Sequence, residues 1–380
     1  MQGICAKISK AGALESEHRV HAFFYLWYGN PEHDGAYLHW NHKVLPHWRE
    51  EVSAQFPVGK EFQPPQDVHS TYYPARGCYS SRDPAVILAQ FDELAAAGVT
   101  VAVLSWWGQS DRKESADTQG VSTDALLPIV FQVAEAQGTV KLAFHLEPYV
   151  GRSAKSVRTD VEYLMERFGA SPALLRWQGK PVYYVYDSYL TPSGEWAAVL
   201  KEDGDDTLRG TSLDGVFIGL WLEYNDGEKL ETAGFDGAYS YFASEGSSYG
   251  STWSSWPRMA QWATENRKLF IASVGPGYND TRIRPWNPGA TRAREEGRLY
   301  KRAWRHAIDG GADVISITSY NEWGEGTQIE PAKPSVTSGG APFEDYGADG
   351  PKIYLNLTKK LVGDFKKRRR ESQGSLREEL

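Results

Sequence analysis

The sequence predicts a single-domain α/β fold, the (β/α)8 TIM barrel, with long loops at the carboxyl ends of its strands. Eight short apolar or aromatic segments alternate with helical patterns along 380 residues, which is typical of repeated βα units. No internal repeat or linker divides the chain, and barrels commonly reach this length as one domain. We expect the barrel over residues 20–365, an N-terminal extension over 1–19 and a charged tail over 366–380.

The eight predicted strands are short runs rich in aliphatic and aromatic residues. They are Val20–Trp27, Val99–Ser105, Lys141–Leu146, Pro181–Tyr186, Gly215–Leu222, Gly237–Tyr241, Leu269–Val274 and Val314–Thr318. A TIM barrel closes with this number of strands.

Helix signals lie between the strands. Asp83 and Pro84 suit an N-cap and a first helical residue, and Gly98 marks the end of that helix. Apolar residues at helical spacing predict three more helices: Leu126–Val133 ending at Gly138, Val157–Phe168 ending at Gly169, and Tyr300–Ile308. These stripes face the core, and we assign them no functional role.

Two connections are long: Gly29 to Tyr79 after the first strand, and Ala243 to Trp253 after the sixth. Long loops in a compact domain are usually functional, and in a barrel they belong at the carboxyl ends of the strands. We expect Pro331–Gly350, which is rich in Pro, Gly and Ser, to be a mobile loop before the last helix.

Composition argues against several classes of protein. The net charge is −8, so nucleic acid is not expected as a partner, and the basic run Lys366–Arg370 is interpreted as a solvated helix end. No apolar run approaches the ~18 residues that span a bilayer, and no signal-peptide pattern is found. Cys5 and Cys78 allow at most one disulfide and have no metal-site spacing. We expect a soluble, unanchored monomer.

Aromatic residues are unusually common, with 14 Trp and 21 Tyr. Aromatic faces suit sugars, whose C–H faces are apolar while their rims are polar. Most predicted strands end in such residues or in polar ones, where a barrel builds its active site. They are Tyr25, Trp27 and Tyr28; Ser105, Trp106 and Trp107; His145, Glu147 and Tyr149; Tyr186 and Asp187; Trp221 and Glu223; Tyr239 and Tyr241; and Tyr320, Asn321, Glu322, Trp323 and Glu325.

Glu322 and Glu325 are the strongest catalytic candidates, because they follow the last strand within four residues of each other. Two neighbouring carboxylates cannot both ionise freely, so one can act as an acid while the other acts as a base. Glycoside hydrolysis requires this division of roles. Two ordinary surface glutamates are the alternative that spacing alone leaves open.

His145 and Glu147 lie two residues apart on a strand, so their side chains share one face. They could orient a substrate hydroxyl, form a structural pair, or hold a metal together with His39 and His42.

The run from Ser273 to Tyr278 is glycine-rich, but it lacks the Lys-Ser/Thr of a phosphate loop and predicts a tight turn. Arg284, Trp286 and Asn287 follow it and could line a sugar subsite.

Six motifs together resemble the endo-α-mannosidases of glycoside hydrolase family 99. They are HAFFYLWYGNPEHDGAYLHWNH, YSSRDP, FHLEPY, YVYDSY, SVGPGY with IRPWN, and SITSYNEWGEGTQIE, in order from His21 to Pro331. The resemblance implies a metal-independent (β/α)8 hydrolase without a cofactor. It implies cleavage of an internal α-mannosidic bond with retention, which releases a Glc-Man or Man-Man disaccharide from high-mannose N-glycans or α-mannans.

The resemblance also assigns roles to residues. Glu322 would deprotonate the mannose 2-hydroxyl, so that its oxygen displaces the leaving group through a 1,2-anhydro sugar, and Glu325 would protonate the leaving oxygen and later activate water. The expected substrate-binding residues are Tyr28, Trp107, His145, Glu147, Tyr241, Arg284, Trp286 and Asn321. The family further implies the Golgi lumen for an animal protein and the periplasm or secretion for a bacterial one.

One residue bears on the substrate. Animal members resemble SWY where this chain has Ser105-Trp106-Trp107. A Trp face offers less hydrogen bonding than Tyr, so we expect a preference for Man-Man over Glc-Man. Two other classes remain open: a sugar-binding barrel that has lost catalysis, and a metal-dependent barrel hydrolase that uses His145 and Glu147.

Overall fold

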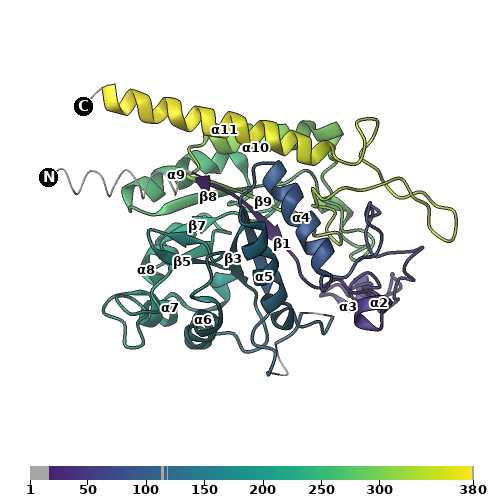
Figure 1. Ribbon diagram of the computed structural model, residues 1–380, viewed down its shortest axis with the longest axis horizontal. Coiled ribbons are helices and arrows are strands. Elements are labelled where there is room, and N and C mark those ends of the chain that lie inside the picture. Colours follow the sequence, from purple (N-terminus) through teal and green to yellow (C-terminus); the bar gives the residue numbers. More distant parts are fainter. Residues whose placement is uncertain (1–16, 113–114, 118, 379–380) are drawn as a thin grey trace.

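The computed structural model describes residues 17–112, 115–117 and 119–378 and forms a (β/α)8 barrel (Figure 1). Eight parallel strands surround the axis, and β3 pairs with β5 to close the ring. They are β1 (Val20–Phe24), β2 (Val101–Trp106), β3 (Lys141–Leu146), β5 (Lys180–Val185), β6 (Val216–Leu220), β7 (Gly237–Tyr239), β8 (Leu269–Val274) and β9 (Val314–Ile317). All eight predicted strands are confirmed, with ends shifted by a few residues at most.

One strand was not predicted. β4 (Arg176–Trp177) pairs antiparallel with the start of β5 as a short hairpin outside the barrel. A two-residue strand has no alternating pattern that a sequence could reveal.

Helices cover the outside of the barrel. The longer ones are α4 (Pro84–Ala96), α5 (Leu127–Gln137), α6 (Ala154–Phe168), α7 (Ser193–Leu200), α8 (Asp226–Ala233), α9 (Trp256–Glu265), α10 (Arg298–Asp309) and α11 (Ile353–Glu378). The four predicted helices correspond to α4, α5, α6 and α10. Two single-turn helices, α2 (Pro31–Asp34) and α3 (Glu50–Ser53), lie in the long loop after β1.

Two of the predicted helix boundaries have the expected chemistry. The Asp83 side chain accepts a hydrogen bond from the Ala85 amide and caps α4. Gly138 ends α5 at a φ of 78°, a left-handed conformation that glycine adopts without a steric cost. Gly169 follows α6 but stays in the right-handed region at a φ of −61°.

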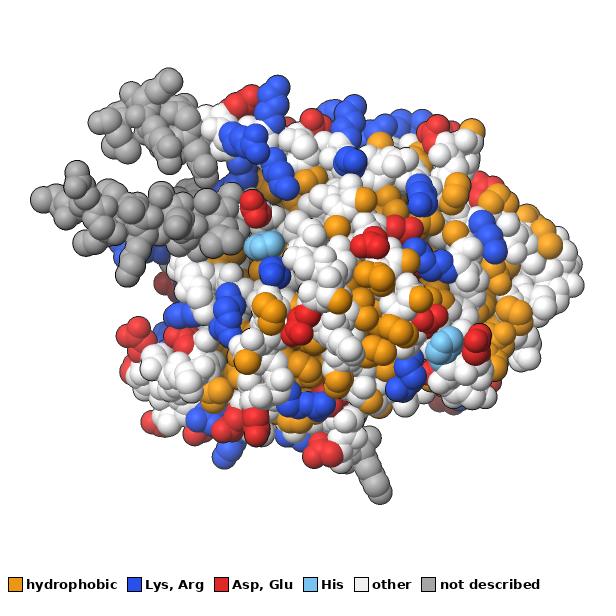
Figure 2. Space-filling model, in the orientation of Figure 1, with side chains coloured by type: hydrophobic (Ala, Val, Ile, Leu, Met, Phe, Trp, Pro, Cys, Tyr) orange, Lys and Arg blue, Asp and Glu red, His pale blue; other side chains and the backbone are white. Residues whose placement is uncertain are grey.

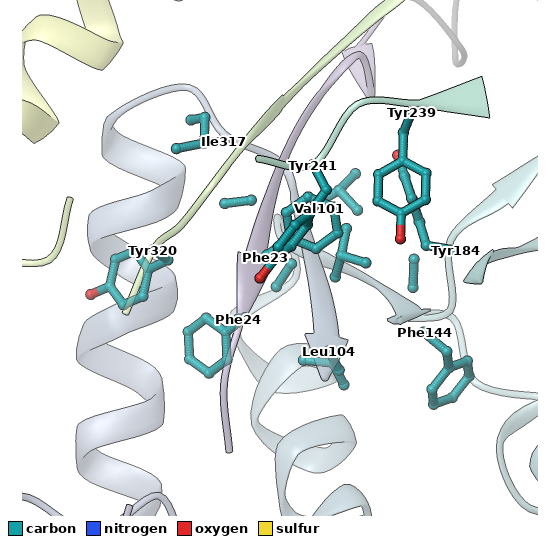
Figure 3. Packing of buried hydrophobic residues seen from close by; sticks show 14 of the residues in the cluster. Phe23, Phe24, Val101, Leu104, Phe144, Tyr184, Tyr239, Tyr241, Ile317 and Tyr320 are labelled. Atoms are coloured by element: carbon teal, nitrogen blue, oxygen red, sulfur yellow. The ribbon is translucent and has the colours of Figure 1, made fainter. Parts of the chain in front are cut away.

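Alternation along β1 separates the barrel interior from its outer shell. Phe23 points inward, and its ring contacts those of His145, Tyr184, Tyr239 and Tyr241. The next residue, Phe24, points outward and packs on Phe91 of α4 and on Tyr320 (Figure 3). The interior side of β1 therefore supports the residues at the top of the barrel.

The basic tail continues a helix and also contacts the barrel. Helix α11 runs without a break across residues 365–366, and Figure 2 shows basic side chains along the upper edge, where Figure 1 places α10 and α11. Arg369 is not a solvated end as interpreted from the sequence. Its Nη1 donates to the carbonyl oxygens of Ala312 and Asp313, at 3.2 and 3.3 Å. These two residues directly precede β9.

The segment Pro331–Gly350 is fixed at several points, contrary to the expectation of a mobile loop. Ala332 and Glu344 form bridges with Pro74 and Tyr72. The buried Tyr346 hydroxyl donates to the carbonyl oxygen of Glu330 at 2.8 Å. The two bridges tie the segment to the loop after β1, and the Tyr346 hydrogen bond ties it to the loop after β9.

Two further observations concern the remaining expectations. Within the described residues, no helix is long and apolar enough to cross a membrane. Cys78 carries a free thiol, and Cys5 lies outside the described residues.

Candidate active site

A cavity of about 170 Å³ opens where the strands of the barrel end. Its wall combines carboxylates, imidazoles and aromatic rings from the long loop after β1, from the ends of several strands and from the loops after β8 and β9. The lining residues are Tyr25, Trp27, His39, His42, Leu45, His69, Trp107, Glu147, Tyr186, Tyr241, Ile283, Arg284, Glu322, Gly324 and Glu325. Both catalytic candidates therefore face the same cavity.

The loop after β9 is folded by its own hydrogen bonds. The Ser319 amide donates to the Thr327 carbonyl at 3.0 Å, and the Glu322 amide donates to Ser319 Oγ at 2.7 Å. The Gly324 amide donates to Glu322 Oε1 at 2.8 Å. This loop presents Glu322 from a fixed backbone.

Glu322 is nearly buried, with 6% of its surface exposed. Burial raises the pKa of its carboxyl well above the usual range, and the charge of Glu325 raises that pKa further. The amide of Gly324 opposes the shift because it stabilises the anion. The environment therefore favours the protonated form of Glu322.

Glu325 lies nearer the opening, with a side chain that is 23% exposed. Burial raises the pKa of its carboxyl, and Arg284, whose Nη1 lies 3.4 Å from Glu325 Oε1, lowers it. The same guanidinium nitrogen lies 3.1 Å from Oδ2 of Asp280. The protonation of Glu325 thus depends on the balance between desolvation and a fixed cation.

Asp280 organises this part of the wall and was missed by sequence reasoning. It is fully buried, and its carboxylate accepts hydrogen bonds from Arg284, from the Tyr278 hydroxyl at 2.9 Å and from Asn287 Nδ2 at 3.0 Å. All three donors belong to residues 278–287, so the Asp280 carboxylate holds this segment together. Its only sequence signal was its position four residues before Arg284.

Glu147 reaches the cavity from the end of β3. Its Oε1 accepts a hydrogen bond from Ser105 Oγ at 2.8 Å and lies 3.0 Å from His145 Nδ1. The other ring nitrogen of His145 lies 2.8 Å from the Tyr239 hydroxyl. This chain of contacts fixes the orientation of the Glu147 carboxylate.

Two tyrosines of the cavity lining contact each other. The hydroxyls of Tyr25 and Tyr241 are hydrogen-bonded to each other. Tyr241 has a φ of 50°, unusual for a residue with a side chain, and its amide donates to Ser273 Oγ at 2.7 Å. The strained backbone directs the Tyr241 ring toward the site.

Three histidines form one wall: His39 and His42, which the sequence suggested only as possible metal ligands, and His69, which sequence reasoning missed. His39 stacks on Trp27, with ring centroids 4.0 Å apart, and its Nε2 contacts the Asp117 carboxylate. The His42 and His69 rings stack at 5.8 Å. Burial lowers the pKa of His42 to about 3 and that of His69 well below its usual range, so both are neutral at pH 7.

Several buried polar atoms of the cavity wall have no hydrogen-bond partner among the described residues. They are Nε1 of Trp27, Nε1 of Trp107, Nδ1 of His39 and both ring nitrogens of His69. A buried polar atom without a partner is costly, so such atoms are usually satisfied by water or by a ligand. A polyhydroxylated ligand matches this wall.

The cavity contains only some of the residues that were predicted to bind substrate. Glu147, Trp107, Tyr241 and Arg284 line it together with the two catalytic candidates. The other four lie outside the lining: Tyr28, His145, Trp286 and Asn321.

Three of these four hold the site in place. The Tyr28 hydroxyl donates to the Asn321 carbonyl at 2.9 Å and accepts from the Trp323 amide at 3.1 Å. The Asn321 side chain bonds to the backbone of Tyr25 in both directions. His145 positions Glu147 as described above.

Not every side chain at a strand end faces the cavity, although the sequence analysis grouped all of them as candidates. Trp106 Nε1 donates to Asp124 at 2.8 Å, Tyr149 bonds to Asp160, and the Trp221 ring packs on Trp262. These side chains lie outside the cavity lining, against neighbouring helices and loops. Strand pleating sends alternate residues away from the barrel interior.

The arrangement gives no support to a metal site that combines His145 and Glu147 with His39 and His42. Across residues 17–112, 115–117 and 119–378, no three His, Cys, Asp or Glu side chains are grouped to hold one ion. His145 and Glu147 contact each other, and His39 contacts Asp117.

Comparisons with known proteins agree with this geometry. The family model described as "Glycosyl hydrolase family 99" matches residues 15–367. A protein from Danio rerio named "Glycoprotein endo-alpha-1,2-mannosidase-like protein" is 43% identical over 93% of this chain and 79% of its own length. The "Glycoprotein endo-alpha-1,2-mannosidase" of Rattus norvegicus is 40% identical over 92% of this chain and 75% of its own length.

A solved structure is similar over almost its whole length. The GH99 endo-α-mannosidase from Bacteroides thetaiotaomicron has a TM-score of 0.84 and 39% sequence identity, covering 93% of this chain and 98% of its own.

Proposed function

The chain belongs to glycosyl hydrolase family 99 and is a glycoside hydrolase, and from this premise we propose that it is a retaining endo-α-mannosidase. It cleaves an internal α-mannosidic bond of high-mannose N-glycans or α-mannans and releases a Glc-Man or Man-Man disaccharide. The names of the vertebrate and bacterial relatives support the substrate class. Action on glycoproteins would place the chain in a compartment where glycans are processed.

The observation that carries the proposal is the pair of carboxyls, Glu322 and Glu325, in one cavity, where burial raises the pKa of both and the charge of Glu325 raises that of Glu322 further. Such a pair titrates as a unit, and the two carboxyls can share one proton. A sugar 2-hydroxyl that donates to Glu322 favours the anion there, while a glycosidic oxygen that accepts from Glu325 favours the acid there. Substrate binding itself would therefore assign the two roles.

In the first step, Glu322 removes the proton of the 2-hydroxyl while O2 attacks C1. The C1–O bond of the leaving sugar breaks, its oxygen takes the proton of Glu325, and a 1,2-anhydro sugar forms. In the second step, Glu325 removes a proton from water, whose oxygen attacks C1; the C1–O2 bond of the anhydro ring breaks, and O2 recovers its proton from Glu322. Two inversions at C1 give retention. A 2-hydroxyl is too weak an acid to ionise without such a positioned base.

Other lining residues would bind the released disaccharide. We assign Glu147 and Tyr241 to the mannose at the cleavage point, because their orientations are fixed by His145, Ser105 and Ser273. The unpartnered indole nitrogens of Trp27 and Trp107 would donate to sugar hydroxyls. We further propose that Trp107 favours a Man-Man cap over a Glc-Man cap.

Mass spectrometry of reaction products tests the function. The chain is incubated with a glucosylated high-mannose glycan and, separately, with an α-1,2-capped mannan oligosaccharide, and Glu322→Gln serves as the inactive control. We expect release of an intact disaccharide, more readily from the mannan. Release of single sugars would contradict endo-cleavage. Binding without release would instead favour a sugar-binding barrel that has lost catalysis.

A further inference from the structure

Three aromatic rings, one exposed and two partly buried, form a cluster at the surface beside the cavity. We call His47, Trp48 and Trp286 the aromatic platform. Trp48 is 79% exposed, which is unusual for a large apolar side chain. Its ring centroid lies 3.6 Å from that of His47 and 5.5 Å from that of Trp286, which stands at 83° to it. The His47 and Trp286 rings lie 4.8 Å apart, also at 83°.

Local hydrogen bonds fix the platform. Trp286 Nε1 donates to the carbonyl oxygen of Leu45 at 3.1 Å. The His47 amide donates to Ser53 Oγ at 2.8 Å, and that hydroxyl donates back to the His47 carbonyl at 2.9 Å. The Arg49 amide donates to His47 Nδ1 at 3.0 Å. The segment that carries Trp48 is therefore held by the hydrogen bonds of the Ser53 hydroxyl and the His47 ring, while the indole itself stays in solvent.

The platform is continuous with the cavity on the side of Glu325. Leu45 and Ile283 both line the cavity, and the Leu45 amide donates to the Ile283 carbonyl at 2.8 Å. Arg284, which contacts Glu325, stands two residues before Trp286 in the same turn. If Glu325 is the acid, this is the side on which the leaving oxygen sits, so the platform extends the site toward the leaving sugars.

We propose that the aromatic platform is a binding subsite for a mannose residue of the leaving-group portion of the glycan, beyond the sugar attached at the cleaved bond. The inference rests on the proposed function. The apolar C–H face of a pyranose packs on an exposed indole, while its hydroxyls remain hydrated. Endo-cleavage leaves several sugars on this side, and an exposed apolar patch that adjoins a binding cavity is typical of an extended ligand site.

The test compares two substrates that share the same mannobiosyl cap. One is an α-mannan oligosaccharide with several mannoses after the cleaved bond, and the other carries an aryl leaving group and no further sugar. For Trp48→Ala we expect KM for the oligosaccharide to rise about fivefold to tenfold with kcat within twofold, because the contact is made equally in the ground and transition states. Both constants for the aryl substrate should stay unchanged.

Two variants control the comparison. Trp48→Phe keeps an aromatic face and should recover most of the affinity. Tyr224→Ala removes another exposed aromatic residue, 50% exposed, which packs on Tyr249 and does not line the cavity. It should leave both substrates unaffected.

An unchanged KM for the oligosaccharide in Trp48→Ala, or an equal rise for both substrates, would overturn the subsite. Failure of the proposed function is seen separately, as no disaccharide release by the unmodified chain. If the unmodified chain releases no disaccharide, fluorescence titration of the unmodified chain and of Trp48→Ala with the mannan oligosaccharide still tests whether the subsite exists. Equal dissociation constants would refute it, and a weaker one for the variant would support it.

Discussion

Arg284 Nη1 lies 3.4 Å from Glu325 Oε1, so a cation stands beside the carboxyl that we propose as the catalytic acid. The position of this cation is fixed, because Arg284 also contacts the buried Asp280 at 3.1 Å. Burial favours the neutral acid, and Arg284 favours the anion. The pH range of the reaction should depend on this balance.

Replacing Arg284 by Met should shift the pH dependence of activity. Loss of the cation removes a contact that lowers the pKa of Glu325. That pKa then rises, and the alkaline limb of the kcat/KM profile should move upward by about one pH unit. Arg298→Met, whose side chain is 61% exposed and pairs with Glu295 and Glu296, is the matched control. An alkaline limb of the kcat/KM profile that stays in place, or moves to lower pH, would show that Arg284 does not lower the pKa of the catalytic acid.

The two carboxyls should respond differently to amide replacement. Glu325→Gln should lower kcat/KM about 10²- to 10⁴-fold on natural glycans and much less on an aryl substrate, whose leaving group needs little protonation. Glu322→Gln should damage both substrates, because the 2-hydroxyl still needs a base. Steady-state kinetics with both substrates checks this. Equal losses for both variants with both substrates would contradict the separate roles of acid and base. Such a result would still be consistent with both residues belonging to the active site.

The buried pair should also reduce stability as pH rises. Because burial raises the pKa of Glu322 in the folded chain, the folded state binds more protons than the unfolded state above about pH 4.5. Stability therefore falls as pH increases through the raised pKa. We expect Glu322→Gln to melt about 2–4 °C higher than the unmodified chain at pH 8, and at the same temperature at pH 4. Calorimetry at both pH values measures this, and a lower Tm at pH 8 would disprove it.

Trp107→Tyr should shift the preference between caps. A tyrosine hydroxyl can hydrogen-bond the outer sugar, which typically contributes about 0.5–1.5 kcal/mol. The ratio of kcat/KM for Glc-Man over Man-Man caps should rise about threefold to tenfold. Trp107→Phe, which adds no hydroxyl, should give no such rise. An unchanged ratio in Trp107→Tyr would reject the assignment of cap preference to this residue.

Glu330 should matter for stability rather than for chemistry. Its carboxylate is 1% exposed and accepts hydrogen bonds from Arg76, Gln90, Tyr79 and Trp323 at 2.8–3.1 Å. Glu330→Ala leaves these donors unpaired and should lower the free energy of unfolding by about 3–5 kcal/mol. Glu296→Ala, at a site 79% exposed, should change it by less than about 0.5 kcal/mol. Urea unfolding of both variants distinguishes the two; similar stabilities would mean that Glu330 is not structural.

The sequence by itself determined the barrel and the catalytic candidates. Each barrel strand is a short local run such as Leu269–Val274, and Gly138 marks the end of α5. Glu322 and Glu325 were identifiable because they lie close together in the chain after the last strand. Such signals are local, so they can be seen without knowing which segments pack together.

Only the tertiary structure decided which side chains reach the cavity. Tyr28, His145 and Asn321 are close in sequence to lining residues, yet they hold the site from behind. His39, His42 and His69 line it from a loop whose path no periodic pattern reveals. Asp280 and Glu330 become important through partners that lie from 2 to 254 residues away in the sequence. Whether a polar side chain faces a ligand or a neighbouring backbone depends on contacts between distant segments, which local sequence does not encode.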